Sequence, residues 1–171
     1  MDNIDQNRRK WLGYGAITLG FSLLPSHAFA ALTTPRPKIL RFENLHTGEF
    51  LKTELTRLNH LFRDHRNNKI KTIDPKLFDQ IYLLQMLMGT NKPVQLVSGY
   101  RSVETNNALR RKSSGVAKNS YHTHGRAMDF HIKGIELSHI RKAALKMRAG
   151  GVGYYPNSNF VHIDTGPVRK W

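Results

Sequence analysis

The segment that decides the fold spans residues 120–132 and reads SYHTHGRAMDFHI. It begins as a polar, histidine-rich turn, and the pattern from Ala127 to Ile132 predicts a strand. Side chains alternate between the two faces of a strand, so Gly125, Ala127 and Asp129 are predicted to share one face. The first two have almost no side chain and would leave room beside the carboxylate. Because a buried carboxylate is costly unless it is paired or bound to a metal, we expect a partner in that space.

The partners predicted for Asp129 are two histidines. His122 lies in the turn before the strand and can fold back over the space, which gives half of a nitrogen and oxygen site of the kind that Zn²⁺ accepts. A second predicted strand, residues 160–165, places His162 and Asp164 on one face. Two histidines and one aspartate would leave a fourth position for water, as in a catalytic zinc site. From spacing alone, a polar network without a metal is the leading interpretation.

The remainder of the chain predicts helices and strands in irregular alternation. Strands are expected at residues 38–42, 49–53, 94–98, 127–132, 151–155 and 160–165, and helices at residues 54–66, 75–89, 103–112 and 137–147. Asp74 before Pro75 is typical of a helix N-cap, and Met86 and Met88 are interpreted as core filler in that helix. The alternation is too irregular for a doubly wound parallel sheet. We therefore predict one α+β domain, residues 31–171, with helices packed on one face of a mostly antiparallel sheet.

The composition restricts the chemistry that this domain can perform. The chain has 171 residues, 39% of them apolar, which is enough to bury a core without disulfides. It contains no cysteine, and this excludes a disulfide scaffold, a thiol nucleophile and any cysteine-ligated zinc or iron–sulfur site. Catalysis would therefore depend on histidines, carboxylates, hydroxyl groups or a metal held by nitrogen and oxygen.

Residues 1–30 are predicted to be an export signal rather than part of the fold. Arg8 and Arg9 precede an apolar run, Pro25 breaks that run, and residues 28–30 read AFA, the small-x-small pattern that a signal peptidase cuts. The run is too short to span a bilayer stably, for which ~20 residues are needed. An amphipathic or buried helix is the alternative interpretation.

The pair Arg8-Arg9 resembles the twin-arginine export signal of bacteria. Asn7 stands where that signal commonly has serine or threonine, so the Sec route stays open. By either route we expect the mature chain to begin near Ala31 and to act in the periplasm of a Gram-negative bacterium. No cysteine follows the signal, which excludes a lipoprotein. The export machinery is expected as a transient partner, and no stable membrane anchor is expected after cleavage.

The chain is strongly basic, with 27 lysines and arginines against 12 acidic residues and a formal charge of +15. Basic residues are spread along the sequence apart from the run Arg110–Lys112, and no aromatic residues are interleaved, so no nucleic acid is expected as a partner. For an exported cation the favoured partners are anionic polymers of the cell envelope, such as peptidoglycan stem peptides with their free carboxylates. A solvated basic surface without a dedicated ligand is an equal alternative.

Most of the remaining histidines are expected to be ordinary surface residues. They lie on predicted helices or in the predicted hairpin turn: His46, His60, His65 and His139. His131, on the strand face of Asp129, and His124 are further candidates for proton transfer or substrate contact.

Three ordered blocks resemble the zinc site of the M15 peptidases. They are Ser98-Gly99-Tyr100-Arg101-Ser102, then Ser120-x-His122-x-x-Gly125-x-Ala127-x-Asp129, then a stretch from Gly150 to Gly166 that contains His162-x-Asp164. Together they are most similar to the murein endopeptidase K branch of that group, over residues 40–171. The resemblance implies an α+β domain of the M15 peptidase and hedgehog type. It also implies zinc held by His122, Asp129 and His162, and an arginine over the site, Arg101, that contacts the substrate carbonyl or carboxylate.

This chain departs from the M15 pattern at the position of the general base. Several M15 relatives place glutamate or aspartate three residues before the last zinc ligand, where this chain has Asn159, which cannot take a proton. Asp164 is the replacement candidate for the catalytic base, and it is an equal candidate for a carboxylate that orients His162 through its outer ring nitrogen.

The resemblance implies a zinc-dependent murein endopeptidase that cuts cross-links between peptidoglycan stem peptides, including those that join two diaminopimelate residues. Two alternatives stay open. One is a carboxypeptidase of the same family that removes terminal D-Ala. The other is a non-catalytic module that binds peptidoglycan and keeps zinc only for structure.

Overall fold

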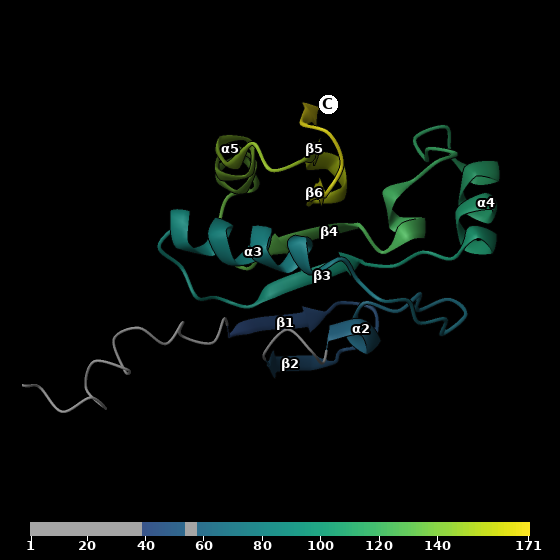
Figure 1. Cartoon of the computed structure of the whole chain (residues 1–171), viewed down its shortest axis with the longest axis horizontal. Coiled ribbons are helices and arrows are strands. Elements are labelled where there is room, and N and C mark those ends of the chain that lie inside the picture. The colour runs from purple at the N-terminus through teal and green to yellow at the C-terminus, as the bar shows by residue number, and fades with distance from the viewer. Residues whose placement is uncertain (1–38, 54–57) are drawn as a thin grey trace, which may run out of the picture. The chain divides into compact units, whose positions relative to one another are not determined.

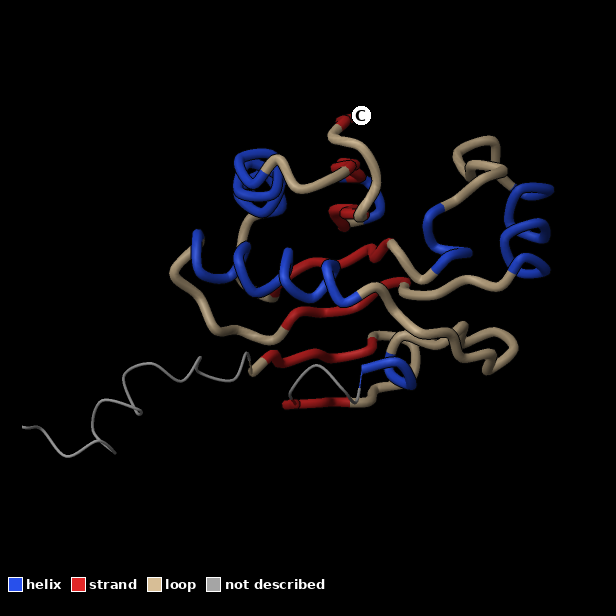
Figure 2. The backbone as a smooth tube through the Cα atoms, viewed as in Figure 1, coloured by secondary structure: helices blue, strands red, loops and turns tan. Residues whose placement is uncertain are grey.

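The computed structural model describes residues 39–53 and 58–171. The predicted export signal, residues 1–30, lies outside the described residues. The strands are β1 (Leu40–Asn44), β2 (Phe50–Thr53), β3 (Val94–Ser98), β4 (Ala127–Ile132), β5 (Gly151–Tyr155), β6 (Phe160–Asp164) and β7 (Arg169–Lys170). The helices are α2 (Leu58–Leu61), α3 (Pro75–Leu87), α4 (Val103–Lys112) and α5 (Leu137–Met147), with short 3₁₀-helices η2 (Tyr121–His124) and η3 (Pro156–Ser158) (Figures 1 and 2).

The described strands form one sheet in the order β2-β1-β3-β4-β6-β5-β7. The pairs β1–β3 and β5–β7 are parallel, and the other neighbours are antiparallel. Helices α3 and α5 contact each other, and α5 also contacts β4, β5 and β6. The prediction of an α+β domain with a mostly antiparallel sheet is therefore confirmed.

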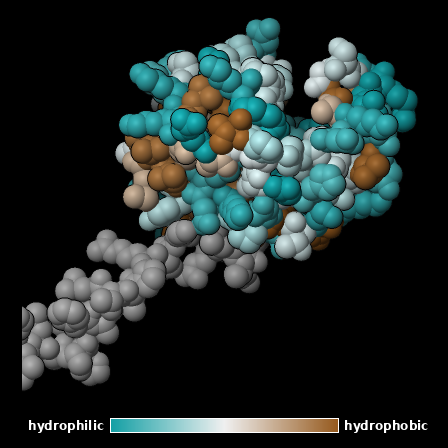
Figure 3. All heavy atoms as spheres, turned by 45° about the horizontal axis from the view of Figure 1, so that its top comes forward, coloured by the Kyte–Doolittle hydropathy of each residue, from teal (hydrophilic) through white to brown (hydrophobic). Residues whose placement is uncertain are grey.

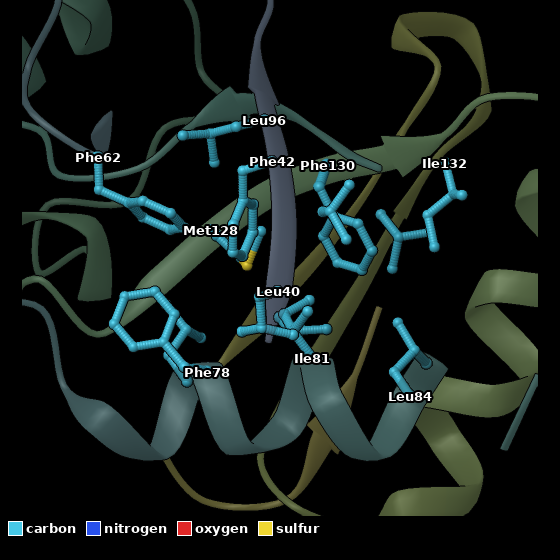
Figure 4. Close-up of a cluster of buried hydrophobic side chains, with 14 of the residues drawn as sticks. Leu40, Phe42, Phe62, Phe78, Ile81, Leu84, Leu96, Met128, Phe130 and Ile132 are labelled. Carbon is cyan, nitrogen blue, oxygen red and sulfur yellow. The ribbon is translucent and has the colours of Figure 1, made fainter. Parts of the chain in front are cut away.

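The core lies between the sheet and helix α3. Alternate residues of β1 are buried, and on β4 the residues Met128, Phe130 and Ile132 are almost fully excluded from solvent. Figure 4 shows Phe78, Ile81 and Leu84 of α3 close to these strand residues. Because strand side chains alternate, this burial fixes the intervening residue Asp129 on the opposite face of the sheet. The core thus determines where the polar residues of β4 lie.

Helix α3 begins as the sequence predicts. The Asp74 side chain accepts a hydrogen bond from the backbone N–H of Lys76, and Pro75 occupies the first turn. After the helix ends, Gly89 has a φ of 60°, a conformation that glycine adopts without strain. The interpretation of both methionines as core filler is wrong for one of them, since Met86 is 62% exposed, whereas Met88 packs against the core.

The predicted helix over residues 54–66 is too long at its C-terminal end. Its described part, α2, ends at Leu61, and Asp64 forms an isolated bridge with Lys69. The buried carboxylate of Asp64 accepts hydrogen bonds from the backbone N–H groups of Arg66 and Ser102. This long-range contact competes with helical continuation, and it leaves no local pattern in the sequence.

In the two described ranges, no helix has the length and apolarity to cross a membrane.

Candidate active site

Three buried side chains converge beside the paired strands β4 and β6. Asp129 on β4 lies directly opposite His162 on β6 in the antiparallel register. His122 comes from η2, whose start is capped by the Ser120 hydroxyl and whose end is closed by Gly125. One potential ligand atom from each of His122, Asp129 and His162 lies within 4.8 Å of the other two. The structure thus brings together the three residues that the sequence nominated as metal ligands.

Each histidine ring is held from its outer side, so that the other nitrogen faces Asp129. The Nδ1–H of His122 donates to the carbonyl of Gly99 at 2.7 Å, and Nε2 lies 3.2 Å from Oδ1 of Asp129. The Nε2–H of His162 donates to Oδ2 of Asp164 at 3.0 Å, and Nδ1 lies 2.8 Å from Oδ1 of Asp129. Two imidazole nitrogens and a carboxylate oxygen therefore meet at one point, a donor set that suits Zn²⁺ and several other divalent metals.

The electrostatics of the site lower the pKa of Asp129 and shift the pKa values of the two histidines in opposite directions. Burial acts to raise the pKa of Asp129, but the charges and hydrogen bonds of His122 and His162 hold that pKa far below its usual range. Burial lowers the pKa of His122 despite the attraction of Asp129. Burial also opposes charge on His162, but hydrogen bonds to Asp129 and Asp164 raise its pKa to about 9.

Asp164 is completely buried and fully occupied by hydrogen bonds. Besides His162, it accepts from the backbone N–H groups of Gly151 and Gly166 and from the guanidinium of Arg169 at 2.6 and 3.1 Å. Burial acts to raise the pKa of Asp164, but these donors hold it well below the usual range. A carboxylate in this setting is a poor proton acceptor, whereas its contact with the outer nitrogen of His162 is well placed to orient that ring.

Arg101 lies beside Asp129, as the resemblance implies. Its side chain is only 11% exposed, and its NH2 atom is 3.7 Å from Oδ2 of Asp129. It donates to Asn106 and Ser98 over 3.4 and 3.5 Å, while its buried Nε has no hydrogen-bond partner within the described ranges. Burial lowers the pKa of Arg101, although the charge of Asp129 opposes this effect. The guanidinium thus keeps donor capacity next to the three converging side chains.

The converging residues line an open cavity of about 500 Å³. The lining includes residues of the loop after α4 and a set of aromatic and basic side chains. The loop residues are Gly115, Val116, Ala117, Asn119 and Ser120, and the side chains are those of Tyr121, Tyr155, Phe160, Arg169 and Trp171. Figure 3 shows the surface hollowed between the end of the molecule that carries α4 and the main body. The size of the cavity suits a peptide segment rather than a single small ion.

Gly125 does not make room beside Asp129, contrary to the prediction. It precedes β4 with a φ of 66°, and a Cβ at this position would meet the carbonyl oxygen of Thr72 at 2.6 Å. The glycine is therefore needed for a left-handed turn and for close packing against another segment. Ala127 lies on β4 as predicted and is completely buried.

The other polar candidates lie outside the cavity lining. His131 pairs with Gln95 across β3 and β4, and its buried Nδ1 has no hydrogen-bond partner in the described part of the chain. His124 is exposed and borders a neighbouring cavity. Asn159 adopts a φ of 52° after η3, where its backbone N–H donates to Pro156. The cavity is also not lined by any of the four ordinary histidines: His46, His60, His65 and His139.

Sequence reasoning missed the wall formed by Arg169 and Trp171. These residues reach the site because β7 pairs with β5, which is a long-range contact without a local pattern. The one available indication was the pair of glycines on β5. A Cβ at Gly153 would lie 2.7 Å from the Trp171 ring, and a Cβ at Gly151 would lie 2.7 Å from NH1 of Arg169. Glycine within a strand often marks such a close approach.

Comparison with known proteins agrees with this geometry. The family model described as "Peptidoglycan L,D-endopeptidase MepK" matches residues 32–171. The Peptidoglycan L,D-endopeptidase MepK of Escherichia coli (strain K12) is 65% identical over 182 residues, covering all of both chains. A Probable peptidoglycan L,D-endopeptidase MepK of Haemophilus influenzae is 48% identical over 183 residues, covering 100% of this chain and 98% of the relative. The resemblance in the sequence blocks is thereby confirmed, and the chain belongs to the peptidoglycan L,D-endopeptidase MepK family of M15-type peptidases.

Proposed function

We propose that this protein is a zinc-dependent endopeptidase that hydrolyses cross-links between the stem peptides of peptidoglycan. One observation carries the proposal: in a member of the MepK family, His122, Asp129 and His162 converge within 4.8 Å at an open cavity. A purely structural metal site is closed by four protein ligands, whereas a catalytic site keeps one position open. The three-ligand set and the adjoining cavity favour catalysis over a module that only binds peptidoglycan.

The ligands of the metal would be Nε2 of His122, Nδ1 of His162 and the carboxylate of Asp129. When bound there, zinc would lower the pKa of a coordinated water towards ~7 and polarise the scissile carbonyl. The residues fit this role because the nitrogens facing away from Asp129 are already fixed, by Gly99 and by Asp164. These hydrogen bonds orient both imidazole rings in the metal-free protein, so that their other nitrogens already face the position of the metal.

Arg101 and Asp164 have different roles in this proposal. Arg101 donates to the oxygen of the scissile carbonyl as negative charge develops on it, since its guanidinium is desolvated and adjacent to Asp129. Asp164 is a positioning residue that holds His162. It is a poor candidate for the base, because Arg169 and two backbone N–H groups already occupy its oxygens.

We also propose that residues 1–30 are a cleaved export signal, read by the twin-arginine or the Sec machinery, and that the domain acts in the periplasm without a stable membrane anchor. The free carboxylates of peptidoglycan suit the basic chain. Fractionation of cells that express the full chain tests this proposal. Replacing Arg8 and Arg9 together by lysine should block export by the twin-arginine route and leave the Sec route largely intact.

The decisive test uses the purified domain and defined cross-linked muropeptides, with zinc or with chelator, followed by mass spectrometry. We expect zinc-dependent conversion of L,D-cross-linked dimers to monomers. His162→Ala should abolish the conversion, and His139→Ala, which changes an exposed histidine on α5, should leave it unchanged. Release of single D-Ala residues would instead indicate a carboxypeptidase. Stoichiometric zinc without any product would favour the binding module.

A further inference from the structure

Arg169 presents a guanidinium to the active-site cavity from the edge of the sheet. Strand β7 pairs with β5, and the backbone of Trp171 exchanges hydrogen bonds with Val152 and Tyr154. This pairing places both Arg169 and Trp171 in the cavity wall, with the indole of Trp171 5.2 Å from the His162 ring. Arg169 is therefore next to the catalytic centre and not on a remote surface.

A guanidinium has two pairs of parallel N–H groups that can each bind a carboxylate. In Arg169 the pair formed by NH1 and NH2 is occupied by the two oxygens of Asp164, and NH1 also donates to the carbonyl of Pro167. The second pair, Nε–H and the remaining N–H of NH2, has no acceptor within residues 39–53 and 58–171. The side chain is 38% exposed, so this second pair is accessible to a ligand.

Aromatic rings hold the guanidinium in place. Its central carbon lies 5.0 Å from the ring centre of Tyr121 and 5.1 Å from that of Trp171, both within the range of cation–π attraction. The indole N–H of Trp171 in turn donates to the hydroxyl of Tyr155 at 2.6 Å. With Asp164 on one edge and two rings around it, Arg169 is preorganised to receive a second anion.

The substrate of the proposed reaction offers such an anion. When a cross-link joins two diaminopimelate residues, the peptide bond ends on an amino group whose carbon also carries a free carboxyl group. Hydrolysis releases this amino group, so the carboxylate lies close to the scissile bond on the leaving side. We infer that Arg169 is a specificity-determining residue that binds this carboxylate through Nε and NH2. This inference rests on the proposed function and adds a preference for free over amidated carboxyl groups.

Arg126 provides a control arginine, because it packs on the same tyrosine ring with similar exposure, donates to Thr165 instead of Asp164, and does not line the active-site cavity. Its central carbon lies 5.1 Å from the same Tyr121 ring, and its side chain is 42% exposed. It borders the neighbouring cavity with His124 and is absent from the lining of the active-site cavity. A carboxylate bound at the active site should therefore not depend on Arg126.

The experiment compares two L,D-cross-linked dimers that differ only in whether the carboxyl group beside the scissile nitrogen is free or amidated. For each protein, kcat/KM is measured on both and their ratio is taken. Arg169→Gln also loses the contact with Asp164, but this loss slows cleavage of both dimers equally and therefore leaves the ratio unchanged. Any intrinsic effect of amidation on reactivity is the same for every protein, so it does not affect the comparison of their ratios. We expect the ratio of free to amidated substrate to fall about 10- to 100-fold in Arg169→Gln, the loss expected for a charge-assisted pair. Arg126→Gln should keep the ratio of the unaltered protein.

Arg169→Lys extends the test if the glutamine variant does not fold, which thermal unfolding would reveal. Lysine keeps the charge but has no parallel pair of donors, so the ratio should fall only in part. An unchanged ratio in both folded variants, or equal cleavage of the two dimers by the unaltered protein, would overturn the inference while leaving the proposed function intact. If the unaltered protein cleaves neither dimer, the proposed function fails and this inference fails with it.

Discussion

The outer ring nitrogen of His162 is 3.0 Å from Oδ2 of Asp164, two residues further along β6. The same carboxylate is paired with Arg169 and has no exposed surface. The sequence left two roles for Asp164 equal: general base, or carboxylate that orients the metal ligand His162. The two roles can be told apart, because removing the charge of Asp164 has different consequences in each case.

Asp164→Asn tests the two roles directly. If Asp164 positions His162, zinc affinity should fall by about 10- to 100-fold, and much of the activity should return when zinc is raised to saturation. Isothermal titration with zinc, followed by assays across a range of zinc concentrations, measures both quantities. A base would behave in the opposite way, with unchanged zinc affinity and a loss of about 10²- to 10⁴-fold in kcat that zinc does not restore.

The pKa of His162 predicts how zinc binding depends on pH. In the metal-free protein both ring nitrogens face carboxylates, and the pKa is raised to about 9. Below that pH, zinc must displace a proton from Nδ1, so its apparent affinity should increase about tenfold per pH unit between pH 7 and pH 8 and less steeply up to pH 9. Competition with a chelator of known proton affinity measures this. An affinity that is constant over that range would exclude His162 as a protonated ligand.

The raised pKa of His162 also predicts that the metal-free protein becomes less stable as pH rises, whereas zinc affinity increases. A histidine whose folded pKa lies above its unfolded value of 6.5 stabilises the fold below that value and loses this effect as pH rises to about 9. Urea unfolding of the chelated protein should therefore give a lower free energy of unfolding at pH 9 than at pH 6.5. In His162→Gln this part of the pH dependence should be absent, whereas His139→Gln should retain it.

Arg101→Lys should reduce turnover far more than stability. Lysine keeps the charge but cannot reproduce the planar set of donors next to Asp129. We expect kcat to fall by about 10²-fold, as for loss of one donor to a developing oxyanion, with little change in the melting temperature. Arg110→Lys, at an exposed position on α4, is the control. Equal activity of the two variants would remove Arg101 from the mechanism.

The sequence predicted most of the elements that surround the site because their patterns are local. The alternation in residues 127–132 and the periodicity of residues 103–112 and 137–147 match β4, α4 and α5. The error in the length of one predicted helix has a clear physical cause. The predicted helix over residues 54–66 ends early because the Asp64 carboxylate binds the distant backbone of Ser102, and no local pattern encodes such a contact.

In the candidate site, too, local patterns were predictable from the sequence and long-range contacts were not. His122, Asp129 and His162 were found because spacing and strand alternation predict which side chains meet. The contribution of Arg169 and Trp171 depends on pairing between β5 and β7, so it became visible only in the folded chain. The roles of Asp164 could be separated only once its other hydrogen-bond donors were known.

Gly153→Ala tests whether the wall formed by Trp171 matters for function. The added Cβ would lie 2.7 Å from the indole, so the ring must shift. We expect the free energy of unfolding to fall by about 1–3 kcal/mol, the usual cost of overpacking, and KM for cross-linked dimers to rise. In protein that begins at Ala31, Trp171 is the sole tryptophan of the sequence, and its fluorescence should change as the ring moves. Gly115→Ala, where the nearest atom is 3.6 Å away, should preserve stability and emission. If Gly153→Ala keeps the emission and KM of the unaltered protein, Trp171 does not shape the substrate site.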